Sequence, residues 1–248
     1  MLTTLFSNII NINQTASTND YVSKLLKTKK AEEGTVIFAN LQTNGKGQRE
    51  ANWESEFGKN ILTSMIISPS MPIRNQFNIT IFISLALYDL LHKYFGEKVN
   101  IKWPNDILIA DKKIAGILVQ NIVSGDIVKD AIVGVGLNVN QKKFLTYSTK
   151  ATSFALELKQ KVALPLLQNE LLAAVEYRYL QFQEGKSEEM KYEFLTNLFG
   201  FKQFRDYIIE DKKTKAEIID IDESGQLVLA FEDAYTKAFS LKEVKYVI

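Results

Sequence analysis

One short run around a proline constrains the fold of this chain more than any other segment. It spans Lys102 to Asp106 and reads KWPND, and a second run, Lys113 to Leu118, begins seven residues after the aspartate. Proline fixes its own φ and has no amide proton to give to a ladder. The apolar residues on either side, 101–103 and 107–109, are therefore predicted to form two short strands that turn at Pro104.

Strand alternation makes a prediction about the segment after this hairpin. Following a turn at Ala110 to Lys112, the run Ile114 to Val119 is expected to be extended. A period of two puts Lys113 on one face with Ala115, and Gly116 on the other face. A lysine at the mouth of a hairpin can reach an anion while its strand stays buried. The cation, carboxylate, carboxamide and glycine gathered here therefore suit a charged acyl or phosphoryl group.

The composition is that of a globular protein, with 46% hydrophobic and 24% charged residues among 248. A net charge of +1 gives no overall field that would attract nucleic acid or a membrane. We find no apolar run of about 18 residues and no signal peptide, so we expect a cytoplasmic protein. The absence of cysteine excludes thiolate catalysis and disulfides. The single histidine, His92, falls on a predicted helix surface, so we expect Lys, Arg, Asp, Asn and backbone amides to run the chemistry.

Apolar periodicity predicts an α+β fold, in which a mixed β-sheet packs against helices. Besides the hairpin, strands are expected at 9–12, 36–39, 60–68 and 131–139. Helices are expected at 18–26, 75–95, 153–158, 166–182 and 188–199, the first capped by Ser17 or Thr18. Short β-type runs then recur at 207–209, 216–221, 227–231, 237–241 and 244–248, which indicates a small barrel. We therefore predict two domains, 1–199 and 200–248.

The hairpin resembles the signature of bacterial biotin protein ligases (biotin–[acetyl-CoA-carboxylase] ligases). Three further segments match that family in the same order. Ser17 to Asn19 stands where the family has Ser-Thr-Asn at a helix start, and Thr43 to Arg49 with Trp53 resembles its glycine- and arginine-rich loop. Val133 to Asn138 resembles its Gly-hydrophobic-Gly-hydrophobic-Asn strand end. The matches run from about residue 15 to about residue 155.

The loop after Gly45 departs from the family pattern. Lys46, Gln48, Glu50 and Ala51 stand where the family has arginine, arginine, glycine and arginine. Lysine keeps a charge but loses the bidentate fork of arginine, and whether Arg49 replaces a missing arginine is left open. The third glycine of a dinucleotide-binding motif is absent, as is the Gly-Lys-Ser/Thr of a phosphate loop. We expect a mobile loop that closes on an anionic ligand.

The resemblance implies an ATP-dependent ligase that forms biotinyl-5′-AMP and transfers biotin to a lysine of the biotin carboxyl carrier protein. It implies a class II synthetase-like catalytic domain with biotin and ATP sites, a C-terminal SH3-like barrel, and ATP and Mg²⁺ as cofactors. The chain starts almost at once on the catalytic pattern, so a short form without the N-terminal DNA-binding domain is expected, with no nucleic-acid or membrane partner. A homodimer through a sheet edge is left open.

The resemblance also implies roles for individual residues. Lys113 is the expected catalytic cation, between the biotin carboxylate and the α-phosphate. Asp106 is expected to orient Mg²⁺, Lys113 or the incoming amine, and these alternatives stay open. Biotin-binding residues are expected to be Ser17, Thr18, Asn19, Gln42, Gly45, Lys46, Gly47, Gln48, Lys113, Gly116 and Gly134. ATP-binding residues are expected to be Lys46, Arg49, Trp53, Lys102, Asn105, Lys113 and Asn138.

Three alternatives accompany these expectations. A lipoate–protein ligase or octanoyltransferase of the same superfamily would also move a carboxylate onto a carrier lysine. A relative that binds biotin without catalysis would account for the altered loop. At the level of single residues, Lys102 could pair with Asp106 instead of binding nucleotide.

Overall fold

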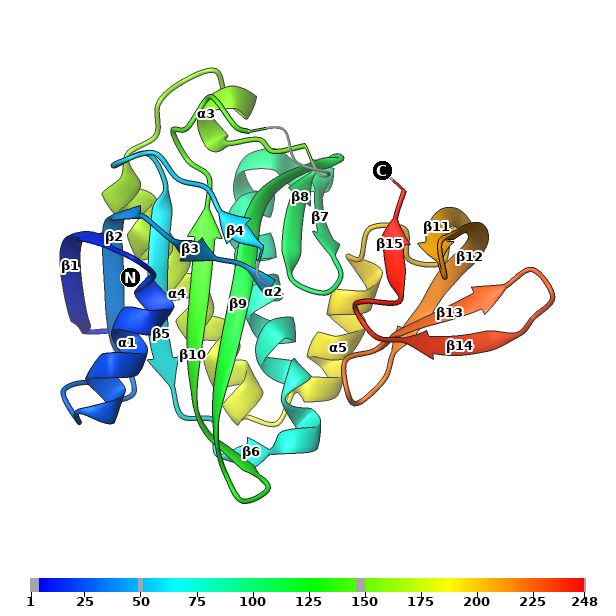
Figure 1. Ribbon diagram of the computed structural model, residues 1–248, viewed down its shortest axis with the longest axis horizontal. Coiled ribbons are helices and arrows are strands. Elements are labelled where there is room, and N and C mark those ends of the chain that lie inside the picture. The colour runs from blue at the N-terminus through cyan, green and yellow to red at the C-terminus, as the bar shows by residue number, and fades with distance from the viewer. Residues whose placement is uncertain (1–4, 49–50, 146–149, 248) are drawn as a thin grey trace.

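The computed structural model describes residues 5–48, 51–145 and 150–247, and its fold is α+β (Figure 1). A mixed sheet with helices on both faces makes up most of the chain. A separate antiparallel sheet follows at the C-terminal end. The predicted fold class is confirmed.

The large sheet has eight strands, of which only the first two are parallel. Its order is β1 (Asn8–Thr15), β2 (Thr35–Gln42), β5 (Ile61–Ile67), β10 (Ile127–Leu137), β9 (Lys112–Ser124), β8 (Asp106–Ile109) and β7 (Val99–Lys102), with β6 (Met71–Pro72) beside β10. Strand β5 is buried throughout, and β10 is buried over most of its second half, because both faces of the sheet are covered there. The predicted strands are present, and β9 extends further than its apolar run suggested.

Helix α1 (Thr18–Lys27) covers one face of the sheet. Ser17 caps it by accepting a hydrogen bond from the Asp20 amide. On the opposite face lie α2 (Phe77–Phe95) and α4 (Leu164–Gln183), followed by α5 (Ser187–Thr196) (Figure 1). Short pieces are α3 (Phe154–Glu157) and the 3₁₀ turns Ile73–Asn75 and Gly96–Lys98. Among the described residues, no helix combines the length and the apolar character that crossing a membrane requires.

The C-terminal sheet is antiparallel throughout. Its order is β14 (Thr236–Phe239), β13 (Leu227–Phe231), β12 (Lys212–Ile221), β11 (Arg205–Ile209) and β15 (Val244–Tyr246). Each strand matches one of the evenly spaced runs expected from the sequence. The domain boundary at residue 200 stays a prediction.

The β7–β8 hairpin is held between the two sheets. The indole Nε1 of buried Trp103 donates to the carbonyl of Gly225, 2.9 Å away in the β12–β13 turn. Gly225 has φ +87°, and a Cβ there would lie 2.4 Å from Cδ2 of Phe77 at the start of α2. The outer edge of β7 is covered as well, because Ile101 exchanges backbone hydrogen bonds with the chain leaving α5. The C-terminal sheet therefore docks directly on the hairpin.

This docking predicts different costs for two glycines that share a positive φ. In Gly225→Ala, backbone strain and the collision with Phe77 should together lower the free energy of unfolding by about 2–4 kcal/mol. Gly125→Ala, at φ +59° with no atom within 4 Å of the added Cβ, should lose only about 1 kcal/mol. Chemical denaturation measures both, and equal losses would mean that the turn does not dock closely.

Candidate functional site

A pocket of about 720 Å³ lies where the two sheets meet. This volume is in the range that small-molecule sites occupy. Its walls come from the start of α1, the small β3–β4 ribbon (Gly45–Lys46 and Asn52–Trp53), the β7–β8 hairpin, strands β9 and β10, and β15. The sequence-predicted residues that line it are Ser17, Thr18, Asn19, Gln42, Lys46, Gly47, Gln48, Trp53, Lys102, Asn105, Asp106, Lys113, Gly116 and Gly134.

One end of the pocket holds a buried polar network. The amide and hydroxyl of Thr18 donate to Oε1 of Gln42 at 2.8 and 3.0 Å. The hydroxyl of Ser64 lies 2.7 Å from that of Thr18 and 2.6 Å from Oδ1 of Asn19. Gly134 makes room for this arrangement, since a Cβ there would lie 2.3 Å from the Asn19 oxygen. Fixed amides and hydroxyls of this kind can recognise a small polar head group.

Ser64 is a member of this network that motif reasoning missed. It is fully buried on β5, in the run Ile61–Ile67, which is otherwise almost wholly apolar. A buried hydroxyl in such a strand needs partners. The polar pair Thr63 and Ser64 inside the apolar run was the available signal.

At the other end of the pocket, Lys113 and Asp106 form an ion pair. The ammonium Nζ lies 2.6 Å from Oδ1 of Asp106, and both side chains are mostly covered. Lys113 also lies 5.5 Å from the centre of the Trp53 ring. The catalytic cation and carboxylate proposed from the sequence therefore lie together.

The face predicted for Lys113 was wrong, and a β-bulge is the reason. Ile107 pairs with Ala115 but Leu108 pairs with Lys113, so Ile114 is an extra residue in β9. One extra residue reverses the alternation on one side of the bulge. Lys113 accordingly shares a face with Gly116, whose ideal Cβ would lie 3.3 Å from Nζ. The bulge turns the lysine into the pocket.

Lys102 does not take the alternative role of pairing with Asp106. It stands directly opposite Asp106 in the β7–β8 register, yet the carboxylate contacts Lys113. No ion pair joins Lys102 to any of the described residues. Burial lowers the pKa of Lys102, the neighbouring Lys113 charge acts in the same direction, and Asp106 opposes both. Lys102 is thus a partly buried cation without an ion-pair partner among the described residues, 5.4 Å from the ring centre of Tyr246.

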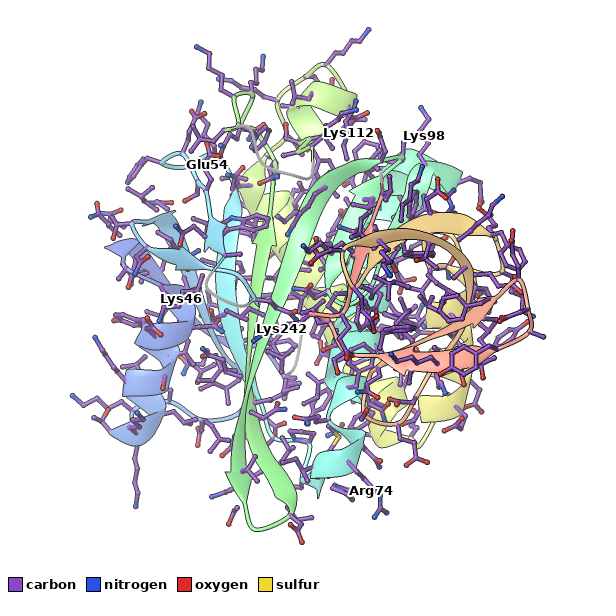
Figure 2. The ribbon with its side chains drawn as sticks, turned by 45° about the vertical axis from the view of Figure 1, so that its right-hand side comes forward. Lys46, Glu54, Arg74, Lys98, Lys112 and Lys242 are labelled. Carbon is purple, nitrogen blue, oxygen red and sulfur yellow. The ribbon has the colours of Figure 1, made fainter. Side chains whose placement is uncertain are left out.

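The indole of Trp53 lies against two glycines of the sheet. A Cβ on Gly136 would come within 2.4 Å of its Cε2, and one on Gly116 would lie 3.0 Å from its Cζ3. In the same loop, Lys46 pairs with Asp20 of α1, with Nζ 2.7 Å from Oδ2, and Figure 2 shows it on the α1 side of the molecule. Arg49 and Glu50, which were singled out with this loop, lie outside the described residues.

Two sequence-predicted residues do not line the pocket. Gly45 packs inside the β3–β4 ribbon, where a Cβ would lie 2.6 Å from the carbonyl oxygen of Trp53. Asn138 is buried, and its Nδ2 donates to the carbonyl of Thr152 at 3.0 Å. Asn105 does line the pocket, but its amide Nδ2 donates to the Ile117 carbonyl at 2.6 Å.

The wall formed by the C-terminal sheet was also missed. It consists of Ile208, Leu241, Val244, Lys245, Tyr246 and Val247. No local motif marks these residues, because they reach the pocket only through the docking of the two sheets. Burial raises the pKa of the Tyr246 phenol.

A metal could find only one carboxylate here. Among the described residues that line the pocket, Asp106 is the sole acid, and the described part of the chain has no group of three or more His, Cys, Asp or Glu suited to a metal. Mg²⁺ often binds through one carboxylate, with phosphate and water supplying its other ligands. Asp106 could serve as such a single carboxylate ligand. The described residues of the pocket offer no second acid for a site with more protein ligands.

The packing of Trp53 predicts an energetic coupling. Gly136→Ala should displace the indole and lower the free energy of unfolding by about 1–3 kcal/mol. In a Trp53→Ala background the same change should be nearly neutral, because the colliding atoms are gone. A double-mutant cycle by chemical denaturation measures this, with the fluorescence of Trp103 as the probe that all four proteins share. Additive losses would contradict the contact.

Comparison with known proteins shows that residues 12–138 match the Biotin/lipoate A/B protein ligase family. The bifunctional ligase/repressor BirA of Bacillus subtilis is 37% identical over 117 residues, 47% of this chain and 36% of that protein. The biotin–[acetyl-CoA-carboxylase] ligase of Paracoccus denitrificans is 33% identical over 129 residues, 51% of this chain and 52% of that protein. The aligned region thus spans about a third to a half of these relatives.

A solved structure extends the similarity to nearly the whole fold. Biotin protein ligase from Aquifex aeolicus, in complex with biotin and ATP, superposes with a TM-score of 0.78 at 23% identity, covering 97% of this chain and 98% of that one. The fold, including the C-terminal sheet, is therefore that of a biotin protein ligase. Since the family match covers half of the sequence and the fold agrees, the chain belongs to the biotin/lipoate A/B protein ligase family.

Proposed function

We propose that this protein is a biotin–[biotin carboxyl carrier protein] ligase. The observation that carries the proposal is one pocket that holds both a buried hydroxyl–amide network and the Lys113–Asp106 pair. The network suits the ureido head of biotin, and the pair lies where a carboxylate tail would end. Four lysines and one aspartate line the described part of this pocket, which favours a polyanion such as ATP beside it.

In the first half-reaction, a biotin carboxylate oxygen attacks the α-phosphorus of ATP. The bond from that phosphorus to the bridging oxygen breaks, and pyrophosphate leaves. Two anions must approach each other, so a fixed cation between them stabilises the transition state. Lys113 supplies this charge from the bulge in β9, and Asp106 holds its ammonium at 2.6 Å until ligands arrive.

The nucleotide side of the pocket is assigned to Lys102, Trp53 and the loop that follows Lys46. Lys102 offers a partly buried charge that makes no ion pair with the described residues, and the Trp53 ring offers a flat apolar surface to a base. Mg²⁺ would offset triphosphate charge, with Asp106 as its one protein ligand. Asn138 does not line the pocket and its Nδ2 donates to the Thr152 carbonyl, but its Oδ1 has no hydrogen-bond partner among the described residues. Its contact with nucleotide stays a prediction from the sequence.

In the second half-reaction, a carrier lysine attacks the acyl carbon of biotinyl-AMP. An amide forms, the carbon–oxygen bond to phosphate breaks, AMP leaves, and the amine gives up a proton. The name of the Paracoccus denitrificans relative points to an acetyl-CoA carboxylase, so we take its biotin carrier domain as the partner.

Pyrophosphate release from MgATP, with biotin or lipoate and without carrier, tests the proposal against its nearest rival. Biotin-dependent release together with the mass of biotinyl-AMP is the expected result. Release with lipoate alone would assign the chain to the other branch of its family. Tight biotin binding with no release would identify a relative that binds without catalysis.

Removing the proposed catalytic cation should abolish most adenylate formation. Lys113→Ala is expected to slow biotin-dependent pyrophosphate release on the order of 10²-fold or more, with an unchanged circular dichroism spectrum. Lys98→Ala is the matched control, because Lys98 is an exposed lysine just before β7 that does not line the pocket (labelled in Figure 2). A near wild-type rate for Lys113→Ala would remove the lysine from the mechanism.

The lowered pKa of Lys102 predicts how ATP binding depends on pH. A lysine whose pKa is lowered loses its charge as pH rises toward the ordinary lysine value of about 10.4. In the wild type, ATP affinity should therefore fall as the pH rises through the lowered pKa of Lys102, below the ordinary lysine value. Lys102→Arg keeps its charge at these pH values and should flatten the decline. Calorimetric titration with ATP measures both proteins, and parallel curves would show that Lys102 does not bind the phosphates.

A further inference from the structure

The bulge that aims Lys113 is held from outside the hairpin. On its open side, the Lys113 amide donates to the Lys150 carbonyl at 2.7 Å, and the Thr152 amide donates to the Lys113 carbonyl at 2.9 Å. Together these make a short parallel bridge between Lys113 and Ala151. Residues 150–152 thus hold the backbone of Lys113 at the point where the pairing of β8 with β9 shifts register.

Asn138 ties the same two segments together from the end of β10. Its backbone amide donates to the carbonyl of Ile114, the extra residue of the bulge, at 2.9 Å. Its side-chain Nδ2 donates to the Thr152 carbonyl at 3.0 Å. Asn138 and Thr152 are both almost fully buried. One asparagine therefore bonds to the bulge through its backbone and to the bridging segment through its side chain.

The bridging segment is anchored once more at its far side. The hydroxyl of Thr152 donates to Oε1 of Glu157 on α3 at 2.6 Å. Lys112 approaches the same carboxylate oxygen at 3.6 Å. Lys112 and Thr152 thus approach the same oxygen of Glu157.

We infer that Asn138 and Thr152 are positioning residues for Lys113, acting by holding the Ile114 bulge in the register that turns the ammonium into the pocket. This inference rests on the proposed function, in which Lys113 is the catalytic cation. A bulge is an interruption of pairing, so its unpaired groups need other partners. If these are lost, β9 can return to regular alternation, which points Lys113 to the opposite face.

A double-mutant cycle separates this role from a direct contact with ligand. Asn138→Ala should slow adenylate formation by about 10- to 100-fold, the effect expected from a small misplacement of a catalytic group. Biotin affinity should change less than about twofold, because the polar network lies elsewhere in the pocket. In a Lys113→Ala background the same substitution should change the rate by less than about twofold. An equal loss in both backgrounds would show that Asn138 acts independently of Lys113 and would overturn the inference.

Asn140→Ala is the matched control. Asn140 lies two residues further along and also ties a loop by its amide, exchanging two hydrogen bonds with Val162. It makes the same kind of contact without touching the bulge. Its adenylate rate should stay close to wild type. A loss equal to that of Asn138→Ala would mean that general loosening of this region explains both.

Amide hydrogen exchange tests the clamp without any activity. Exchange at Lys113 and Thr152 should accelerate at least tenfold in Asn138→Ala, while strand β5 keeps its protection. Thr152→Val, which keeps the shape and removes the hydroxyl, is the second variant in case Asn138→Ala does not fold, and it should act in the same direction. Unchanged exchange at Lys113 in a folded variant would reject the clamp. Absence of biotin-dependent pyrophosphate release in the wild type would instead reject the proposed function, whatever exchange shows.

Discussion

The contact between Lys113 and Asp106 depends on one extra residue in a strand. Without Ile114 in the bulge, the regular alternation of β9 would put the lysine on the opposite face from Gly116 and Asp106. A largely covered ion pair is weak support for stability, because desolvation offsets much of its attraction. We therefore interpret the pair as part of the site rather than of the scaffold. The carboxylate keeps a mobile ammonium in one place, and an incoming anion can compete for it.

Three glycines, which have no side chain, let other parts of the pocket pack closely on the sheet near this ion pair. Gly116 and Gly136 leave space for the Trp53 indole, and Gly134 leaves space for the Asn19 amide. The indole and the amide therefore lie close against β9 and β10.

The sequence was sufficient for the elements, and most of the site residues that it predicted line the pocket, because both depend on local pattern. Apolar periodicity predicted α1, α2 and the five C-terminal strands, and the motifs brought together Thr18, Gln42, Lys102 and Lys113. The sequence was insufficient wherever contacts with a segment distant in the chain determine the local structure. The bulge is stabilised by residues 150–152 and Asn138, so a period of two could not reveal it. Tyr246 reaches the pocket only because the Gly225 turn docks on Trp103.

The proposed reacting residues lie inside the family match, whereas several residues that position or enclose them lie outside it. The family match ends at residue 138, so it includes Lys113 and Asp106 but neither Thr152 nor the β15 wall. A motif can thus identify the reacting groups while the segments that aim and enclose them lie beyond it. Because the β7–β8 hairpin bonds to the C-terminal sheet on one side and to β9 on the other, displacement of the C-terminal sheet would move Asp106 relative to Lys113. Both sheets therefore contribute walls to the pocket, although only the first contains its charged pair.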